Sequence, residues 1–470
     1  MVKFSLSMCT ALTALASVAS AQAPLCYDFT SVDARMTRIV TTQSLSGASL
    51  SLSRPDRLLH RKTYGSYTGS EIVQIASASK WITGVLVMSQ VDDQKIQLDD
   101  PLSKWFGPNL PGLMGQATIR QCMCHCAGFA AQHDALGDLT LTLEQAVNRI
   151  LATPLRQSPG ANFVYGGVSM HIVGRILEIA SGKDLYVLLQ ERILNPLGMR
   201  SVDYNGFGVT KNYRSAGGMR CSLDDYMKLL VMLMNEGVYG TQRVLSAAAV
   251  REMFKDQTAG ARIVFTPQPD DRRYGVGIWR DRVAASGSIL QASSQGASGC
   301  SPWIDFERGL AGVVLLVDEL RDVYGDIDRL QAETRSIVDW EGLLCLGRAT
   351  SSCNGPVAIR GSSAPRSGDA SFALRCARAA PLTAGAMLIA AKNLDQGLPF
   401  FGGELWVDLT TLILLPIATD GLGEATLPLP LTGVPPGLRV VAQAAFFETA
   451  TCGQVGQIDS SAALEITALH

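Results

Sequence analysis

Charge of either sign is scarce in this chain, which limits the partners that it can recognise. Only 17% of its 470 residues are charged, the formal net charge is −2, and no stretch concentrates lysine and arginine. Binding to nucleic acid or to an anionic membrane surface depends on such a concentration. The composition therefore argues against both kinds of partner, while 47% apolar residues provide for a large folded core.

Long apolar runs are missing beyond the N-terminus. The best of them, residues 409–418, is about half the length that a membrane-spanning helix needs, and it contains Pro416. Residues 4–18 are apolar or small, follow Lys3, and precede Ala-Ser-Ala at 19–21, which has the A-x-A form of a signal-peptide cleavage site. We expect residues 1–21 to be a signal peptide, the mature chain to have no membrane span, and the protein to be secreted or periplasmic.

Cysteine is not scarce, and an oxidising compartment would allow some cysteines to pair. Of the eleven, Cys9 lies in the expected signal peptide. Sequence alone does not determine pairing. Because each pair lies within one local region, we expect the disulfides Cys345–Cys353 and Cys376–Cys452.

A cysteine cluster at 122–126 (Cys-Met-Cys-His-Cys) has the residue types of a zinc site. Four ligands so close together in sequence rarely enclose a tetrahedral ion, however. Cys122 and Cys126 share a helix face but fit disulfide geometry poorly. Buried thiols or longer-range disulfides are therefore favoured over a metal site.

Helical and strand-like patterns alternate in an order that indicates an α+β domain over residues 24–346. Strands at both ends of this region with helices between them predict one antiparallel sheet flanked by helices. The expected helices are 31–42, 78–92, 143–152, 170–180, 223–235 and 327–344, and the expected strands are 48–53, 72–75, 274–279, 302–305 and 310–317.

A change of composition separates this region from the rest of the chain. Residues 347–371 are rich in Ser, Gly, Arg and Pro and are expected to form a linker. Residues 372–470 consist of short apolar, often alternating runs between turns, which predicts a small all-β sandwich. Its only histidine is His470 and its acids are few, so a packing or adhesion module is expected there.

The most distinctive chemistry lies at Ser-Ala-Ser-Lys, residues 77–80. The following helical pattern places Ser77 at a helix N-terminus, where free N–H groups favour negative charge on an attacking oxygen. Lys80, three residues later on the same face, can reach the Ser77 hydroxyl. Roughly one or two Ser-x-x-Lys matches are expected by chance in a chain of this length, so an ordinary helix-capping serine beside a solvated lysine stays an alternative.

Three further stretches have a bearing on Ser77. Tyr165 lies in a glycine-rich turn before a helix, and a protonated lysine beside it would lower its pKa and let it shuttle a proton; a core tyrosine is the alternative. Residues 293–299 are small and precede a strand, so they can lend an N–H to an oxyanion or form a flexible hairpin entry. Residues 216–219 (Ala-Gly-Gly-Met) precede a capped helix and can be a simple turn.

Taken in order, several phrases of this chain resemble the serine β-lactamase, penicillin-binding protein and esterase superfamily, specifically its class C β-lactamase and carboxylesterase branch. The resemblance covers residues 30–345. Its phrases are Ala-Ser-Ala-Ser-Lys (76–80), Gln-Leu-Asp-Asp-Pro-Leu-Ser-Lys-Trp (97–105), Ile-Arg-Gln-Cys-Met-Cys-His-Cys-Ala-Gly (119–128), Val-Gly-Arg-Ile-Leu-Glu-Ile-Ala-Ser-Gly (173–182), Asn-Pro-Leu-Gly-Met (195–199) and Ala-Gly-Gly (216–218), together with Tyr165 and the strands at Tyr274 and Trp303.

The resemblance implies a β-lactamase/transpeptidase-like fold and specific catalytic roles. Ser77 would be the acylated nucleophile, Lys80 would help to deprotonate it, and Tyr165 would act as general base and acid. The backbone N–H groups of Ser77 and Ala297 would form the oxyanion hole. Water would then hydrolyse the acyl-enzyme without a metal or cofactor.

Two departures from the family pattern affect substrate recognition. Where the branch has Tyr-x-Asn, this chain has Gly167 in place of the asparagine. Where it has Lys-Thr-Gly or His-x-Gly, this chain has Ser294, Gln295 and Gly296, which lack a cation for an anionic substrate. We therefore expect Gly167 and residues 294–296 to contact a neutral, small-molecule ester or amide. A non-catalytic binding protein on this scaffold and a β-lactamase or D-alanyl peptidase stay as alternatives; the oligomeric state is not predicted.

Overall fold

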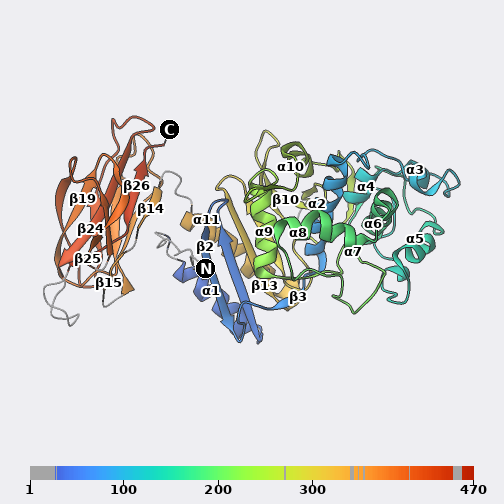
Figure 1. Cartoon of the computed structure of the whole chain (residues 1–470), viewed down its shortest axis with the longest axis horizontal. Helices are drawn as coiled ribbons and strands as arrows, with labels where there is room; N and C mark the ends of the chain where they lie inside the picture. Colours follow the sequence, from blue (N-terminus) through green and yellow to red (C-terminus); the bar gives the residue numbers. More distant parts are fainter. Residues whose placement is uncertain are drawn as a thin grey trace, which may run out of the picture. The chain divides into compact units, whose positions relative to one another are not determined.

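The computed structural model describes residues 27, 29–268, 271–338, 343–347, 349–352, 355–401, 403–447 and 458–469. The chain divides into two compact units, Tyr27–Glu341 and Gly342–His470, which are described separately (Figure 1). The expected signal peptide, residues 1–21, lies outside the described residues. Within the described ranges, no helix has both the length and the apolar character needed to cross a membrane.

The first unit is built on a seven-stranded sheet in which every neighbouring pair is antiparallel. Its first strand pairs with its last, so that Leu50 lies opposite Val314 in the middle of the sheet. The strands, in spatial order, are β2 (Leu58–Gly65), β1 (Gly47–Ser53), β13 (Leu310–Leu316), β12 (Ser301–Asp305), β11 (Ile289–Ser293), β10 (Trp279–Val283) and β9 (Arg273–Tyr274).

Helices cover both faces of this sheet. α1 packs on β1, β2 and α11, whereas α9 packs on β1, β12 and β13 from the other side (Figure 1). Arg35 of α1 joins α11 through ion pairs with Asp326, at 3.1 Å, and Glu333. The helices are α1 (Thr30–Thr42), α2 (Ser79–Asp92), α3 (Leu102–Phe106), α4 (Ile119–Met123), α5 (Leu143–Leu151), α6 (Val168–Ser181), α7 (Leu185–Leu189), α8 (Asn195–Leu197), α9 (Leu223–Met234), α10 (Ala247–Met253) and α11 (Leu320–Val338).

Short elements connect the sheet to the helices. They form the two-stranded pairs β3–β5, β4–β8 and β6–β7 and four single turns of helix. Their bounds are β3 (Ile72–Gln74), β5 (Arg220–Ser222), β4 (Asn162–Val164), β8 (Arg262–Phe265), β6 (Val238–Tyr239), β7 (Gln242–Arg243), η1 (Ala76–Ala78), η2 (Met114–Gln116), η3 (Asp134–Leu136) and the π-helical η4 (Gln190–Leu194).

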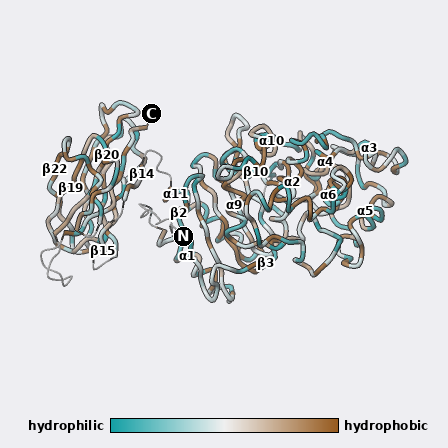
Figure 2. The backbone as a smooth tube through the Cα atoms, in the orientation of Figure 1, coloured by the Kyte–Doolittle hydropathy of each residue, from teal (hydrophilic) through white to brown (hydrophobic). Residues whose placement is uncertain are grey.

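Helix α2 runs through the interior of the first unit. Every residue from Ser79 to Gln90 is buried, as expected for a helix enclosed on all sides, and Figure 2 shows its largely hydrophobic tube. Trp81 of this helix packs edge-on against Phe254, beyond α10, with their ring centroids 6.3 Å apart. The turn η1 leads directly into this buried helix.

The predicted antiparallel sheet flanked by helices is confirmed, but two element predictions were wrong. Residues 274–279 are not one strand, because the chain turns between β9 and β10 at Gly277, where φ is +81°. A side chain there would place its Cβ 2.3 Å from the Lys80 carbonyl oxygen, so glycine permits close contact with α2. The last helix starts at Leu320 instead of 327, and residues 343–346 form a strand of the second unit.

The second unit consists of strands and short turns within its described residues. Its larger sheet has the order β14-β26-β24-β19-β22, with β25 beside β24, and β17-β18-β23 form a second sheet. The strands are β14 (Leu343–Leu346), β15 (Ser351–Ser352), β16 (Gly355–Pro356), β17 (Ala358–Gly361), β18 (Ala373–Ala377), β19 (Ala384–Ala390), β20 (Asn393–Phe400), β21 (Gly403–Val407), β22 (Ile413–Ala418), β23 (Ala425–Pro428), β24 (Arg439–Phe447), β25 (Ile458–Ser460) and β26 (Ala463–Thr467).

The boundary region differs from the expected linker. Within residues 347–371, β15, β16 and β17 form strand pairs, and β17 is hydrogen-bonded along β18. Residues 343–346 pair with β26 instead of closing the first unit, and this pairing joins segments that are more than a hundred residues apart. Periodicity within a short window cannot reveal such a partner, so the sequence placed the boundary too late.

The cysteines do not follow the expected pairing where they are described. Cys376 is a buried free thiol, contrary to the predicted Cys376–Cys452 disulfide. Cys452 and Cys353 lie outside the described residues, as does the side chain of Cys345. The Cys345–Cys353 prediction therefore falls outside the described part of the chain.

Candidate active site

Ser77 lies in the turn η1, immediately before α2, as its sequence predicted. The residue before it, Ala76, has φ of 42°, a conformation that costs a non-glycine residue about 1 kcal/mol or more and is concentrated at functional sites. The Ser79 hydroxyl donates to the Ala76 carbonyl at 2.6 Å and accepts from the N–H of Met219 at 3.1 Å. These bonds hold the turn so that the Ser77 side chain reaches the surface of a cavity.

Lys80 is buried directly behind Ser77. Its ammonium donates to Ser77 Oγ at 3.0 Å and to the Ala216 carbonyl at 2.7 Å. Burial lowers its pKa to about 7, and the positive charge of Arg214 contributes in the same direction. Near neutral pH a large fraction of Lys80 is therefore unprotonated and can accept a proton from Ser77.

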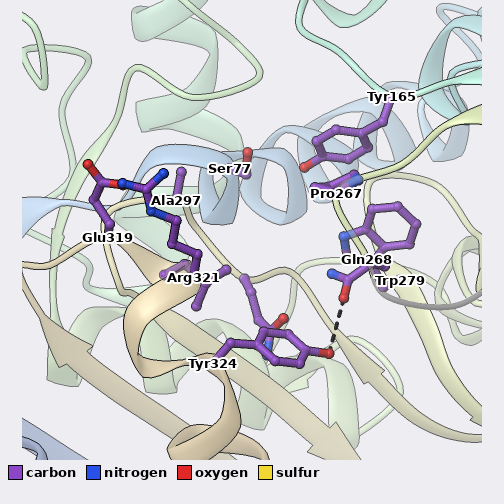
Figure 3. A pocket seen from close by; sticks show the side chains of 11 residues that line it. Ser77, Tyr165, Pro267, Gln268, Trp279, Ala297, Glu319, Arg321 and Tyr324 are labelled. Carbon is purple, nitrogen blue, oxygen red and sulfur yellow. Dashed lines mark hydrogen bonds and ion pairs between the residues drawn. The ribbon is translucent and has the colours of Figure 1, made fainter.

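Tyr165 lies opposite Ser77 on the turn between β4 and α6. Figure 3 shows its hydroxyl directed toward Ser77. Burial raises the pKa of Tyr165 to about 12, although the nearby Ser77 side chain lowers it in part. The expectation that a neighbouring lysine lowers this pKa was wrong, because burial of the hydroxyl dominates, although the Lys80 ammonium lies 4.6 Å from the centre of the ring.

The segment after β11 forms the wall opposite Tyr165. Ala297 is exposed to the cavity, and its N–H donates no hydrogen bond within the described part of the chain, so it is free to bind an oxyanion. At Gly296 a Cβ would lie 2.1 Å from the carbonyl oxygen of Ile75, so glycine is required for the close approach of this segment to the nucleophile turn.

Residues 294 and 295 have different positions in this wall. Ser294 is buried, and its hydroxyl donates to the Ser77 carbonyl at 3.1 Å, so it holds the nucleophile turn instead of facing a substrate as expected. Gln295 does line the cavity, and its Oε1 has no hydrogen-bond partner among the described residues. Of the two residues expected to offer a neutral hydrogen bond to substrate, Gln295 is therefore the one that faces the cavity.

Gly167 lies where the family pattern has an asparagine. It lines the cavity, and a Cβ there would come 3.2 Å from Cδ1 of Leu136. The Leu136 side chain thus occupies part of the volume that a larger residue would need.

The cavity extends in two directions from Ser77. One part, of about 510 Å³, lies along the wall after β11 and includes Trp279, Gln295 and Tyr324 (Figure 3). The other, of about 350 Å³, lies beneath Gly167 and includes Phe207 and Arg214. Ser77, Tyr165, Pro267 and Ala297 line both parts, so a substrate carbonyl at Ser77 can carry one substituent in each.

The cysteine cluster lies behind the site. Cys122, Cys124 and Cys126 are buried free thiols, in line with one of the two favoured interpretations. Between them, the His125 ring packs against Tyr165 and Tyr274, with centroids 4.6 and 4.9 Å apart. Burial lowers the pKa of His125 well below its usual range. In the part of the chain that the structure describes, no group of three or more His, Cys, Asp or Glu side chains is placed to hold a metal ion.

Sequence reasoning brought Ser77, Lys80, Tyr165, Gln295 and Ala297 to one cavity but missed Arg214 and the role of the loop around it. Residues 216–218 had been open to interpretation as a simple turn, whereas the Ala216 carbonyl accepts a hydrogen bond from Lys80. An isolated arginine in a loop has no spacing pattern. Its proximity to Ala-Gly-Gly at 216–218 was the only available signal.

The first unit also matches known proteins. The β-lactamase family model matches residues 32–333. The solved structure of a Bacteroides dorei protein assigned as a candidate β-lactamase is 30% identical, with a TM-score of 0.62, and the match covers 67% of this chain and 99% of that one. D-amino acid amidase from Ochrobactrum anthropi, at 19% identity and a TM-score of 0.54 over 64% of this chain and 99% of that one, shares the fold.

Two curated relatives are named for different reactions. Esterase EstB of Burkholderia gladioli is 25% identical over 37% of this chain and 50% of its own length. The D-alanyl-D-alanine-carboxypeptidase/endopeptidase AmpH of Escherichia coli is 29% identical over 28% of this chain and 37% of its own. The chain thus spans about half the length, or less, of these relatives.

Proposed function

Because the chain belongs to the β-lactamase family, we propose that it is a serine hydrolase that forms an acyl-enzyme on Ser77. One observation carries the proposal: Lys80, with its pKa lowered to about 7, lies 3.0 Å from Ser77 Oγ at the wall of a cavity. A nucleophilic hydroxyl beside a buried base is the arrangement that covalent catalysis requires.

Acylation begins when neutral Lys80 takes the proton of the Ser77 hydroxyl. The Oγ electron pair then bonds to the substrate carbonyl carbon, and the carbonyl electron pair moves to oxygen, where the N–H groups of Ser77 and Ala297 bind it. The tetrahedral species collapses as the bond to the leaving oxygen or nitrogen breaks, and the acyl group stays on Ser77.

Tyr165 supplies the proton for the leaving group. With a pKa of about 12 it is protonated at neutral pH, so it acts as an acid. The Lys80 ammonium returns a proton to the phenolate, which restores both groups. Water then attacks the acyl-enzyme in the reverse sense: Lys80 takes the water proton, the bond to Ser77 Oγ breaks, and Ser77 regains its hydrogen.

The substrate that we propose is an ester or amide whose group along the wall after β11 is neutral. Gln295 offers an amide there, where a cation would be needed to bind an anion. The wider part of the cavity also has Trp279 and Tyr324 in its lining, which suits an apolar or aromatic substituent.

Intact-mass analysis tests the nucleophile. Folded protein incubated with a fluorophosphonate should gain one adduct, and tandem mass spectrometry should place it on Ser77 and not on Ser79, whose hydroxyl is bonded to the backbone. Ser77→Ala should remove both the adduct and the release of p-nitrophenol from neutral p-nitrophenyl esters. Hydrolysis of nitrocefin in parallel assays distinguishes a β-lactamase.

The same data would identify the competing function. A folded wild-type protein that forms no adduct, or a Ser77→Ala variant that behaves as the wild type does, would leave a non-catalytic binding protein on this scaffold.

Export belongs to the proposal as a separate part. It rests on the apolar stretch and on Ala-Ser-Ala at 19–21. N-terminal sequencing of the protein recovered from its native host should begin at Gln22, and an intact Met1 in the exported fraction would contradict it.

A further inference from the structure

Arg214 lines the part of the cavity beneath Gly167, together with Ser77, Lys80 and Tyr165. It is half-buried, and desolvation lowers its pKa. Its charge is felt at the reaction centre, since it contributes to the lowered pKa of Lys80 and of the buried His171. A cation is thus present in the site, on the side away from the wall after β11.

No side chain neutralises this charge among the described residues. The guanidinium lies over the ring of Phe207, 4.1 Å from its centroid, and no ion pair or side-chain hydrogen bond connects it to a carboxylate there. His171, the neighbouring titratable group, has its pKa lowered to about 4 and is hydrogen-bonded to Asn212 at 2.8 Å. A partly desolvated cation without a counter-ion is costly unless a ligand supplies the opposite charge.

The second arginine of the cavity differs in each of these respects. Arg321 lines the wider part, but its side chain is 77% exposed and forms an ion pair with Glu319 at 2.6 Å. Its charge is therefore screened by water and already compensated. Arg214 is the cation that is left for a ligand.

The position of Arg214 is fixed relative to Ser77. Lys80 donates to the carbonyl of Ala216, and Thr83 of the same helix donates to the carbonyl of Ser215 at 2.6 Å. The carbonyl of Arg214 itself accepts from the N–H groups of Gly217 and Gly218 at 3.0 and 2.8 Å. Helix α2 therefore holds both the nucleophile and the backbone that carries the cation, as a preorganised subsite requires.

We propose that Arg214 binds a carboxylate of the substrate, so that this hydrolase acts on esters or amides that carry an anionic group in the part of the cavity beneath Gly167. The inference rests on the proposed function. The inference also makes the proposed substrate more specific, since that substrate is neutral beside Gln295 and anionic at its other end. A guanidinium offers a carboxylate two parallel hydrogen bonds, and Phe207 keeps it in place.

Two matched pairs of esters test the subsite. 4-Nitrophenyl hemiglutarate and its methyl ester place the charge, or its neutral counterpart, on the acyl side; 3-acetoxybenzoate and its methyl ester place it on the leaving group. The readout is the ratio of kcat/KM for the anionic and the neutral member, because any change in the pKa of Lys80 affects both members alike.

Arg214→Met should lower this ratio about 10- to 100-fold for one of the pairs, the range that a charge-assisted hydrogen bond provides. Arg214→Lys should retain part of it. Lys211→Met is the matched control: it removes one positive charge from the same segment, where Lys211 is exposed and paired with Asp184, and should leave the ratio unchanged. Thermal melting checks that the variants are folded.

Failure of this inference is distinguishable from failure of the proposed function. Ser77-dependent hydrolysis with a ratio that Arg214→Met does not change would overturn the subsite alone. If no ester is hydrolysed, calorimetric titration with glutarate decides: binding by the wild type that is lost in Arg214→Met supports the subsite, and equal binding, or none by the wild type, overturns it.

Discussion

Lys80 has two properties that are normally opposed, since it is buried in the protein and yet must exchange protons with Ser77 and Tyr165 during turnover. Burial disfavours its charged form, while its bonds to Ser77 and Ala216 hold the nitrogen in place in either state. With the pKa lowered to about 7, loss of the proton requires little free energy near neutrality. The pKa of Tyr165 is raised to about 12. The two pKa values are thus shifted in opposite directions, which suits Lys80 to act as the base and Tyr165 as the acid.

The pH dependence of turnover should follow Lys80. The active form has neutral Lys80, and the pKa of this group is lowered, so kcat/KM for a neutral ester should rise with pH through an inflection near 7. Lys80→Arg keeps the positive charge but cannot lose it, and should reduce kcat/KM about 100- to 10,000-fold at every pH, the range for loss of a general base. Stopped-flow release of p-nitrophenol measures both when it is followed from about two pH units below neutrality to about two above it.

A profile that is flat through pH 7, or one that falls with rising pH, would assign the base to another group. Undiminished activity in Lys80→Arg would do the same. The rate measured with Ser77→Ala is subtracted at each pH, which corrects for spontaneous hydrolysis of the ester.

At the scale of single residues, the sequence could place those side chains whose spacing is local. Ser77 and Lys80 are one helical turn apart, so their contact follows from helix geometry. Arg214 lies near them because the loop before β5 is hydrogen-bonded to α2. The sequence of that loop does not predict these hydrogen bonds. The raised pKa of Tyr165 likewise comes from its burial in the folded unit, which spacing does not determine.

Among the elements, the segment after β11 and the turn η1 depend on each other. Gly296 brings the two backbones together, and Ser294 then bonds to the carbonyl of Ser77. The distance between the N–H groups of Ser77 and Ala297 is thus set by a contact that only glycine allows. Displacing either backbone by about 1 Å would spoil binding of the oxyanion.

Gly296→Ala should therefore reduce kcat by about 100-fold or more, the effect of losing one oxyanion donor, with little change in far-UV circular dichroism. Gly325→Ala is the matched control, because Gly325 lies in α11 with no atom near its would-be Cβ. It should leave kcat unchanged and stabilise the fold by up to about 1 kcal/mol. Active Gly296→Ala would mean that this contact does not position the oxyanion hole.

Element type followed from sequence better than element bounds. The buried helix α2 and the β12–β13 hairpin have strong periodicity, and both occur where expected. Residues 274–279 have the apolar alternation of a strand, but Val276 and Ile278 are buried in a turn against α2. The alternation predicted correctly which side chains are buried. It did not predict the turn at Gly277, where the backbone packs against Lys80 of α2.

On the scale of the whole molecule, each of the two units is closed by pairing a strand near its start with one near its end. The sheet of the first unit joins β1 to β13, so residues near both of its ends are needed to complete it. In the second unit, β14 pairs with β26, which likewise joins the start of the unit to its end. Composition detected that the chain changes character after residue 346, but only these long-range pairings define the boundary.

The activity should accordingly reside in the first unit alone. Among the described residues, all that line the cavity around Ser77 lie within Tyr27–Glu341, and all strands of the seven-stranded sheet come from it. A chain comprising residues 22–341 should retain kcat/KM for a neutral p-nitrophenyl ester within about threefold, because a domain with its own core folds by itself. Calorimetry should show two unfolding transitions for residues 22–470 and one for the shorter chain. An insoluble or inactive shorter chain, compared at equal concentration with the longer one, would instead make the strands after Gly342 part of what stabilises the site.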